Sequence, residues 1–318
     1  MNIFITGGAG FMGSNFVRFM VDKYPQHSIT NYDKLTYAGD LKNLDDIKGK
    51  KNYKFIEGDV CDFDRLLNLL KDVDCVIHIA AESHVDNSIG NSLIFTKSNT
   101  LGTHALLEAS RLNNVKKFIY VSTDEVYGEV EKGSSKEDSC LLPNNPYSAS
   151  KASADLIARS YYLTYRLPII IVRSNNVYGP YQYPEKIISR FVVNLILGKK
   201  LPMHGDGSYI RTYFYVKDFA RALDLVFEKG KIGEIYNVGT SDEISNIGLT
   251  RKILKKFKKG EEQIEYVKDR PFNDKRYSVD LSKIDALGWK QEYSFEKGLD
   301  ETIEWYKNNK KWWETKVK

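Results

Sequence analysis

The sequence predicts an α/β fold, a doubly wound parallel sheet with helices on both faces, together with a smaller C-terminal lobe. Strand-like apolar runs alternate with helical patterns through the first half of the 318-residue chain, as they do in parallel sheets. A glycine-rich turn joins the first strand directly to the first helix. Beyond Pro180 the alternation breaks into loops and shorter elements, which indicates a second lobe.

The expected elements follow from these patterns. Strands are expected at residues 2–6, 28–32, 53–57, 75–80, 118–122, 169–173 and 235–238. Helices are expected directly after the glycine turn and near residues 64–70, 96–112 and 147–165. The predicted domains are a Rossmann-like nucleotide-binding domain over 1–174, with a returning segment near 212–240, and a substrate-binding lobe over 175–211 and 241–318.

The turn after the first strand predicts a dinucleotide site. It contains Gly7, Gly8, Gly10 and Gly13, which fit both G-x-G-x-x-G and G-x-x-G-x-x-G. Such glycines permit a tight turn, let backbone N–H groups approach a pyrophosphate and allow the helix to pack closely on the strand. Asp33 ends the second strand, where a carboxylate accepts hydrogen bonds from ribose hydroxyls and repels a 2′-phosphate. We therefore predict NAD rather than NADP, against the alternative of a glycine turn without a ligand.

Two groups of reactive side chains predict redox chemistry coupled to elimination. Thr123, Asp124 and Glu125 end an apolar run, while Tyr147 and Lys151 stand four residues apart at the head of a helical stretch. Side chains at i and i+4 share one helix face, so Lys151 could stabilise the phenolate of Tyr147 and let it accept a proton near neutral pH. The adjacent acid and base indicate elimination as well. Either group alone also occurs by chance, as a solvated loop or helix face.

Polar and small residues recur where the expected strands end. They are found at 58–59, 80–81, 123–125 and 174–176. Ligands of parallel α/β sheets bind beyond the carboxyl ends of the strands. These separate parts of the sequence therefore predict one crevice.

Composition narrows the classes of partner. The net charge of +5 is mild, and the densest basic stretches, 48–54 and 252–259, are typical of solvated faces rather than of a nucleic-acid stripe. A positive balance suits an anionic substrate. No apolar run approaches the length of a membrane span, and no secretory signal is expected at the start. We expect no nucleic-acid and no membrane partner.

Cysteine and histidine spacing gives no sign of disulfides or metal. Cys61, Cys75 and Cys140 lack paired spacing, which favours reduced thiols in the cytoplasm. The five histidines are scattered, so no metal site is expected. The aromatic tail is expected to pack rather than to bind a ligand; it comprises Trp305, Tyr306, Trp312 and Trp313.

Longer blocks resemble the nucleoside-diphosphate-glucose 4,6-dehydratases, which belong to the extended short-chain dehydrogenase/reductase superfamily. The blocks are TGGAGFMGSN at 6–15, DKLTYAG at 33–39, AAESHVD at 80–86, STDEVYG at 122–128, PYSASK at 146–151 and YPEK at 183–186. The resemblance extends over essentially the whole chain. It implies a tightly held NAD, a nucleotide-sugar substrate and a homodimer joined through helices 96–112 and 147–165.

The resemblance also implies residue roles. Tyr147 and Lys151 would perform the oxidation, with Thr123 assisting, and Asp124 and Glu125 the dehydration. The implied cofactor-binding residues are Gly7, Gly10, Phe11, Met12, Gly13, Asp33, Lys34, Leu35, Thr36, Ala38, Gly39, Asp59, Val60, Ala80, Ala81, Ser83, Asn99, Tyr147, Lys151 and Asn175. The implied substrate-binding residues are Ser83, Thr123, Asn176, Glu185, Lys186, Arg211, Asn246 and Arg270.

The implied reaction assigns a task to each of these groups. Tyr147 would take the proton of the glucose 4-hydroxyl while carbon 4 gives a hydride to NAD. The new ketone acidifies the hydrogen on carbon 5, which Glu125 would remove while a protonated Asp124 donates to the departing 6-hydroxyl. Hydride return to carbon 6, with Glu125 returning a proton to carbon 5, gives a 4-keto-6-deoxy sugar nucleotide. Adjacent carboxyls with opposite tasks require environments that separate their pKa values.

Sequence features that bear on the nucleotide favour two different bases. Thymidine-linked members commonly show Arg-Asp-Trp where this chain has RTY at 211–213, and tyrosine where it has His204. RPFND at 270–274 and HVDNS at 84–88 are closer to the uridine-linked members. The catalytic core favours thymidine, so we expect dTDP-glucose, with UDP-glucose as the alternative.

Two other classes of protein remain open at this stage. A nucleotide-sugar 4-epimerase or decarboxylase would share the fold, the glycine turn and the Tyr147–Lys151 pair, but an epimerase has no use for Asp124 and Glu125. A non-catalytic NAD-binding regulator would keep the glycine turn and lose the reactive side chains.

Overall fold

The larger lobe is built on a parallel sheet. The computed structural model describes residues 1–269 and 273–317. Seven strands lie in the order β10-β6-β5-β4-β1-β2-β3, and every neighbouring pair is parallel. Their bounds are β1 Asn2–Thr6, β2 Ser28–Asp33, β3 Tyr53–Glu57, β4 Cys75–His78, β5 Lys117–Thr123, β6 Ile169–Ser174 and β10 Ile235–Val238. Every predicted strand is confirmed, including β10, which returns to the edge beside β6.

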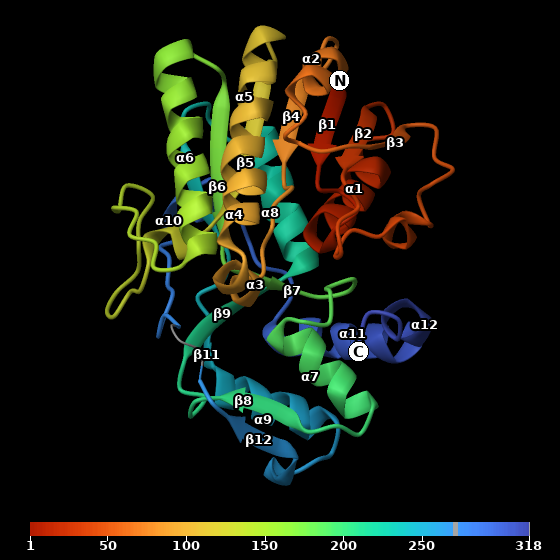
Figure 1. Cartoon of the computed structure of the whole chain (residues 1–318), viewed down its shortest axis with the longest axis vertical. Coiled ribbons are helices and arrows are strands. Elements are labelled where there is room, and N and C mark those ends of the chain that lie inside the picture. Colours follow the sequence, from red (N-terminus) through yellow and green to blue (C-terminus); the bar gives the residue numbers. More distant parts are fainter. Residues whose placement is uncertain (270–272, 318) are drawn as a thin grey trace.

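Helices cover both faces of this sheet (Figure 1). Helices α1 (Phe11–Lys23) and α8 (Val216–Lys229) pack on one face, and α2 (Phe63–Leu69), α5 (Gly102–Leu112) and α6 (Pro146–Tyr165) on the other. Successive residues of a strand point to opposite faces, so Ile3 and Ile5 join the core under α1 and α8 while Phe4 joins the other. The helix predicted at 96–112 begins as a π-helix, Thr96–Leu101, preceded by the short helices α3 (Val85–Gly90) and α4 (Ser92–Phe95).

The smaller lobe lies beyond the carboxyl ends of the strands (Figure 1). One small sheet contains β7 (Asn176–Tyr178), β9 (Ile210–Tyr215) and β11 (Glu243–Ser245), and a second contains β8 (Leu201–His204) and β12 (Ile264–Val267). Its helices are α7 (Ile187–Ile196), α9 (Asn246–Lys256), α11 (Phe295–Asn308) and α12 (Lys310–Trp313), while α10 (Ser282–Ala286) contacts β10. Because β9 pairs within the small lobe, the segment that returns to the large sheet starts at α8.

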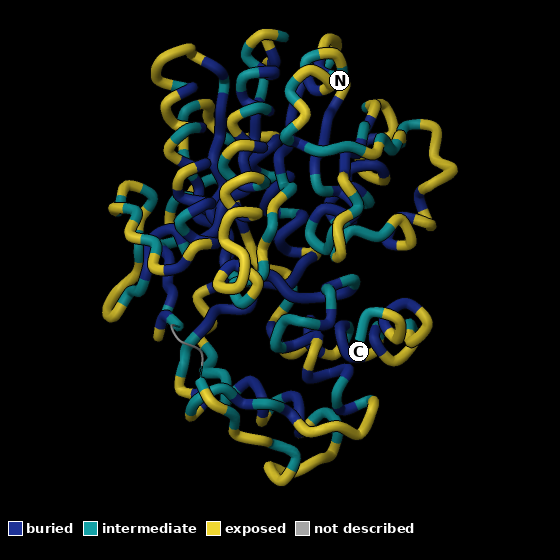
Figure 2. The backbone as a smooth tube through the Cα atoms, in the orientation of Figure 1, coloured by how far each residue is buried: buried dark blue, intermediate teal, exposed yellow. Residues whose placement is uncertain are grey.

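Burial follows this architecture. The strands and the inner faces of their helices are buried, while the outer helix faces are exposed (Figure 2). Tyr306 and Trp313 of the aromatic tail are fully buried, so the expected packing role is confirmed. Across residues 1–269 and 273–317, no helix has the length and apolarity needed to cross a membrane.

A buried ion pair ties helix α6 to strand β6. Arg173 donates to both carboxylate oxygens of Asp155 at 2.9 Å, and both side chains are almost completely buried. The same guanidinium donates to the hydroxyl of Tyr127 at 2.8 Å and to the carbonyl of Glu137 at 3.0 Å. The pair thus holds the helix that carries Tyr147 against the sheet.

Replacing Arg173 with alanine should therefore destabilise the protein strongly. The change leaves the Asp155 carboxylate buried without its partner, which typically costs about 3–5 kcal/mol. Lys256→Ala is the matched control, because its ion pair with Asp300 is solvent-exposed and should contribute less than about 1 kcal/mol. Urea denaturation measures both changes, and equal losses of unfolding free energy would contradict this account.

Candidate active site

Two adjoining cavities lie where the carboxyl ends of the strands meet the small lobe. The first, termed the cofactor cleft, runs along the glycine turn and the ends of β2, β3 and β4. The second, termed the substrate pocket, extends between the large sheet and the small lobe. The residues that line both are Phe11, Met12, Ser83, Ser122, Tyr147, Gln182, Glu185 and Lys186. The expected convergence on one crevice is therefore confirmed.

The glycine turn has the geometry of a dinucleotide cradle. Gly7 adopts a φ of 76°, and a Cβ there would lie 2.6 Å from the Cα of Ala80. A Cβ on Gly13 would collide with the carbonyl oxygen of Gly7. Gly10 differs, because a Cβ there would meet only that oxygen, at 3.4 Å, and would otherwise enter the cleft. Gly10 is also the N-cap residue of α1, and no side chain caps this helix end, so the free N–H groups of its first turn suit a pyrophosphate.

Asp33 is held rigidly at the wall of the cleft. Its carboxylate accepts hydrogen bonds from the backbone N–H of Ala9 at 2.9 Å and of Leu35 at 2.8 Å. Burial raises the pKa of Asp33, and these backbone N–H groups oppose the increase. Beside it, Lys34 pairs with Asp59 at 2.6 Å. The residues of the cleft therefore fit a dinucleotide with free ribose hydroxyls.

Most residues expected to bind the cofactor line the cleft. They are Gly7, Gly10, Phe11, Met12, Gly13, Asp33, Lys34, Thr36, Ala38, Gly39, Asp59, Val60, Ala80, Ala81, Ser83, Tyr147 and Lys151. Three expected residues lie outside it. Leu35 lies behind Asp33, Asn99 is bonded to the backbone of Glu82 and to Ser150, and Asn175 lines the substrate pocket instead.

The reactive side chains come from β5 and α6. A 3-10 helix, Asp124–Tyr127, follows β5 directly, and Thr123 caps it by accepting from the N–H of Glu125 at 3.3 Å. Helix α6 begins with a capping box formed by Asn145 and Ser148, which places Tyr147 and Lys151 in its first turns. The hydroxyl of Thr123 donates to Oδ1 of Asp124 at 3.2 Å, and Thr123 is close enough to Tyr147 to oppose the rise in its pKa. The predicted group is thus assembled around one strand end.

Lys151 is held by strand β5 rather than by Tyr147. Its ammonium donates to the carbonyl of Val121 at 2.7 Å and lies 4.4 Å from the centre of the Tyr120 ring. Burial lowers the pKa of Lys151 to about 7. Burial, and then the charge of Glu125, raises the pKa of Tyr147, opposite in direction to the lowering expected from the lysine. Burial of the Tyr147 hydroxyl is therefore the main reason for the difference, and Lys151, which donates to the strand, does not offset it.

Asp124 and Glu125 occupy different surroundings although they are adjacent. Burial and the charge of Glu125 raise the pKa of Asp124 to about 7, although it accepts a hydrogen bond from Asn175 at 2.9 Å. Burial also raises the pKa of Glu125, but the cations Lys186 and Arg211 oppose that increase. The charge of Glu125 thus favours a proton on Asp124, and the two cations favour the charged form of Glu125, the arrangement that an acid beside a base requires.

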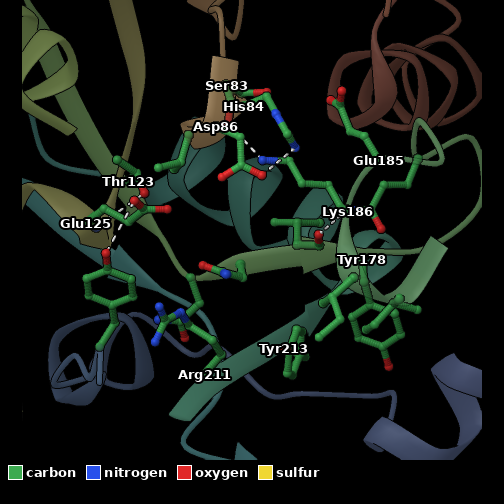
Figure 3. A pocket seen from close by; sticks show the side chains of 18 of the residues that line it. Ser83, His84, Asp86, Thr123, Glu125, Tyr178, Glu185, Lys186, Arg211 and Tyr213 are labelled. Atoms are coloured by element: carbon green, nitrogen blue, oxygen red, sulfur yellow. Dashed lines mark hydrogen bonds and ion pairs between the residues drawn. The ribbon is translucent and has the colours of Figure 1, made fainter. Parts of the chain in front are cut away.

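The substrate pocket collects charged and amide side chains from the small lobe. Figure 3 shows Thr123, Glu125, Lys186 and Arg211 around this cavity. Lys186 donates to the carbonyl of Ser83 at 2.8 Å. The expected residues that line the pocket are Ser83, Thr123, Asn176, Glu185, Lys186, Arg211 and Asn246, whereas Arg270 lies outside the described residues. Across the described chain, no cluster of three or more His, Cys, Asp or Glu is placed to hold a metal.

Several lining residues were missed by sequence reasoning. Tyr277 donates to Asp274 at 2.5 Å, lies 3.5 Å from Glu125 and packs under the guanidinium of Arg211. Gln182 lines both cavities. No local pattern marks Tyr277 as reactive, because it reaches the site from a distant segment. Gln182 stands one residue before the YPEK block, which was the available signal.

Comparison with known proteins agrees with this geometry. Residues 4–302 match the family model described as GDP-mannose 4,6 dehydratase. A trifunctional UDP-glucose 4,6-dehydratase/UDP-4-keto-6-deoxy-D-glucose 3,5-epimerase/UDP-4-keto-L-rhamnose-reductase of Arabidopsis thaliana is 47% identical over 98% of this chain and 48% of its own length. The chain thus spans about half the length of that relative. A dTDP-glucose 4,6-dehydratase of Streptomyces niveus is 43% identical over 99% of this chain and 95% of its own.

A solved structure gives the same result. The dTDP-glucose 4,6-dehydratase DesIV of Streptomyces venezuelae, determined with NAD and TYD bound, superimposes with a TM-score of 0.98 at 43% identity, covering 100% of both chains. The resemblance predicted from the six sequence blocks is therefore confirmed. The chain belongs to the GDP-mannose 4,6 dehydratase family, within the short-chain dehydrogenase/reductase superfamily.

Proposed function

We propose that the chain is an NAD-dependent dTDP-glucose 4,6-dehydratase, a hydro-lyase that forms dTDP-4-keto-6-deoxy-glucose and water. The observation that carries this proposal is that Glu125 and Tyr147 line the substrate pocket, that Tyr147 also lines the cofactor cleft, and that Asp124 is buried directly behind Glu125. The dTDP-glucose 4,6-dehydratases among its relatives support the reaction, and NAD in the DesIV structure supports the cofactor.

Each residue has a chemical task in this proposal. Bound NAD would supply an acceptor for the hydride of carbon 4 and later return it to carbon 6. Tyr147, which lies beside Thr123, takes the proton of the 4-hydroxyl as its phenolate, the form that the positive charge of bound oxidised nicotinamide would stabilise. Glu125, whose charged form Lys186 and Arg211 favour, takes the proton from carbon 5 and returns a proton there when hydride reaches carbon 6. Asp124, protonated up to about pH 7, gives its proton to the departing 6-hydroxyl, so that the leaving group is water.

The remaining site residues receive binding roles. We assign the cleft residues around Asp33 and Gly10 to the cofactor, and Asn176, Glu185, Lys186, Arg211, Asn246 and Arg270 to the sugar nucleotide. Lys186 and Arg211 would meet the negative charge of a diphosphate. The two-lobed division, with NAD on the sheet and the nucleotide sugar against the small lobe, is part of the same proposal.

UDP-glucose is the second candidate substrate. It is favoured by the 47% identity with the Arabidopsis relative, which is named for UDP-glucose. A 4-epimerase is the weaker candidate: the UDP-glucose 4-epimerase of Thermotoga maritima shares the fold, with a TM-score of 0.90 at 31% identity. The buried, protonated Asp124 beside Glu125 has no task in an epimerase.

We further propose a homodimer in the cytoplasm. The outer faces of α4 to α6 expose Leu93 (79%), Leu101 (53%), Leu156 (54%) and Leu163 (48%), which a second copy could cover. Cys61, Cys75 and Cys140 are free thiols, as suits a reducing compartment. Light scattering of the purified protein would give about 73 kDa for a dimer, twice the 36.5 kDa chain.

A panel of sugar nucleotides tests the substrate. We expect keto-sugar formation from dTDP-glucose with a kcat/KM about ten to a hundred times that for UDP-glucose, since a pocket gains only modest discrimination from a methyl and a ribose hydroxyl. The reverse ratio would transfer the assignment to UDP-glucose. His204→Tyr is the probe of this preference, because His204 lines the substrate pocket.

Active-site variants should stop the reaction at different stages. Glu125→Gln and Asp124→Asn keep Tyr147, so carbon 4 should still be oxidised, giving reduced-nicotinamide absorbance without product. Tyr147→Phe removes the hydroxyl and should show no such absorbance, with a rate lower by about two to four powers of ten. Stopped-flow absorbance separates the two stages. Normal turnover by Tyr147→Phe would place the base elsewhere.

The pH profile should report the proton on Asp124. Since its pKa is raised to about 7, the carboxyl is protonated below that pH and loses its proton above it. Because the acid must be protonated, kcat should fall as pH rises through about 7. Any slow product formation that remains in Asp124→Asn should not fall as the pH rises through about 7. Lys151 titrates in the same range, so a decline that persists in Asp124→Asn would assign it to the lysine instead.

A further inference from the structure

We propose that residues 309–317 form a clasp that holds two loops at the rim of the cofactor cleft and thereby slows the release of NAD. The first, termed the ribose loop, covers residues 33–44, and the second, termed the inter-cavity loop, covers residues 179–186. Both contribute lining residues to the cleft, Asp33, Thr36, Ala38 and Gly39 from one and Gln182, Tyr183, Glu185 and Lys186 from the other. The proposal rests on the proposed function for the identity of the cofactor.

On the ribose-loop side, a chain of buried hydrogen bonds leads from the clasp to the nucleotide cradle. The indole N–H of Trp312 donates to Oδ1 of Asn43 at 2.7 Å, and Nδ2 of Asn43 donates to the carbonyl of Ala9 at 2.8 Å. The N–H of Ala9 in turn donates to Asp33 at 2.9 Å. Asn43 is fully buried, so losing either partner would leave a polar group unsatisfied.

An ion pair is the second contact between the clasp and the ribose loop. The ammonium of Lys316 pairs with Asp40 at 2.5 Å and lies 4.8 Å from the ring centre of Trp312. The backbone N–H of Asp40 donates to the carbonyl of Ala9 at 3.0 Å. Ala9 lies within the glycine turn. The contacts of Trp312 and of Lys316 therefore both lead to the carbonyl of Ala9, the first through Asn43 and the second through Asp40.

On the other side, the clasp and α11 support the inter-cavity loop. The Tyr181 ring packs against Trp305 at 4.7 Å and Trp312 at 6.0 Å between centres. Tyr181 has a φ of 68°, a conformation that persists in a non-glycine residue only where packing enforces it. The hydroxyl of Tyr306 donates to the carbonyl of Gln182, and that of Tyr183 to the carbonyl of Lys316 at 3.4 Å.

The clasp acts through the loops, because none of residues 309–317 lines the cleft. A direct bond also joins the loops, since Tyr37 donates to Glu185 at 2.9 Å and its ring meets that of Tyr183 edge-on. Opening the rim therefore requires the two loops to separate. A cofactor that is oxidised again within each turnover has no need to leave, so a slowly opening rim suits it.

The test is a chase of radiolabelled NAD from the loaded full-length protein with excess unlabelled NAD. Trp312→Phe keeps an aromatic ring but removes the N–H donor to Asn43, and we expect dissociation on the order of tenfold faster. Lys316→Met should accelerate it by about threefold, and Lys316→Arg should restore the wild-type rate. Trp289→Phe is the matched control, because Trp289 is a buried tryptophan outside the clasp whose ring packs edge-on against Phe214.

The outcomes separate the clasp from its alternatives. Unchanged dissociation in both Trp312→Phe and Lys316→Met, in proteins with wild-type melting temperatures, overturns the clasp. Equal acceleration in Trp289→Phe also overturns it, because a general loosening of the packing would then explain the effect. If Trp312→Phe does not fold, the two variants Lys316→Met and Lys316→Arg test the clasp without it. A wild type that binds no NAD rejects the proposed cofactor itself, and with it the clasp.

Discussion

The packing of helix α6 on strand β5 is the contact on which the active site depends. Lys151 reaches across it to the carbonyl of Val121, and its own carbonyl accepts from the hydroxyl of Tyr120 at 3.4 Å. The ion pair of Arg173 with Asp155 fixes the same helix to the neighbouring strand. Because the helix is fixed, Tyr147 stands beside the strand end that carries the acid and the base.

The same packing removes these groups from water, and burial rather than any single neighbour sets their protonation. It is the largest cause of the raised pKa of Asp124 and Tyr147 and of the lowered pKa of Lys151. Neighbouring charges then distinguish the two carboxyls, since cations of the small lobe act on Glu125. The small lobe therefore supplies part of the electrostatics as well as the wall of the substrate pocket.

The parts of the fold and the active site that could be predicted from the sequence are those encoded in local patterns. Strand periodicity, the glycine turn and the spacing of Tyr147 and Lys151 are encoded over short segments, so the sheet and the reactive group followed from them. Individual side-chain contacts between segments far apart in the sequence were not predictable. Tyr277 contacts Glu125 although the two are 152 positions apart in the sequence, and Trp312 contacts Asn43 although they are 269 positions apart. The bond from Lys151 to Val121 and the burial of the Tyr147 hydroxyl are likewise tertiary features that helical spacing does not reveal.

The central claim is that Asp124 and Glu125 carry out an elimination between two hydride transfers. Isotope tracing tests it most directly. With dTDP-glucose deuterated at carbon 4, the product should carry that label at carbon 6, and in heavy water it should gain deuterium at carbon 5. Inversion at carbon 4 without solvent hydrogen at carbon 5 would contradict the account and identify an epimerase.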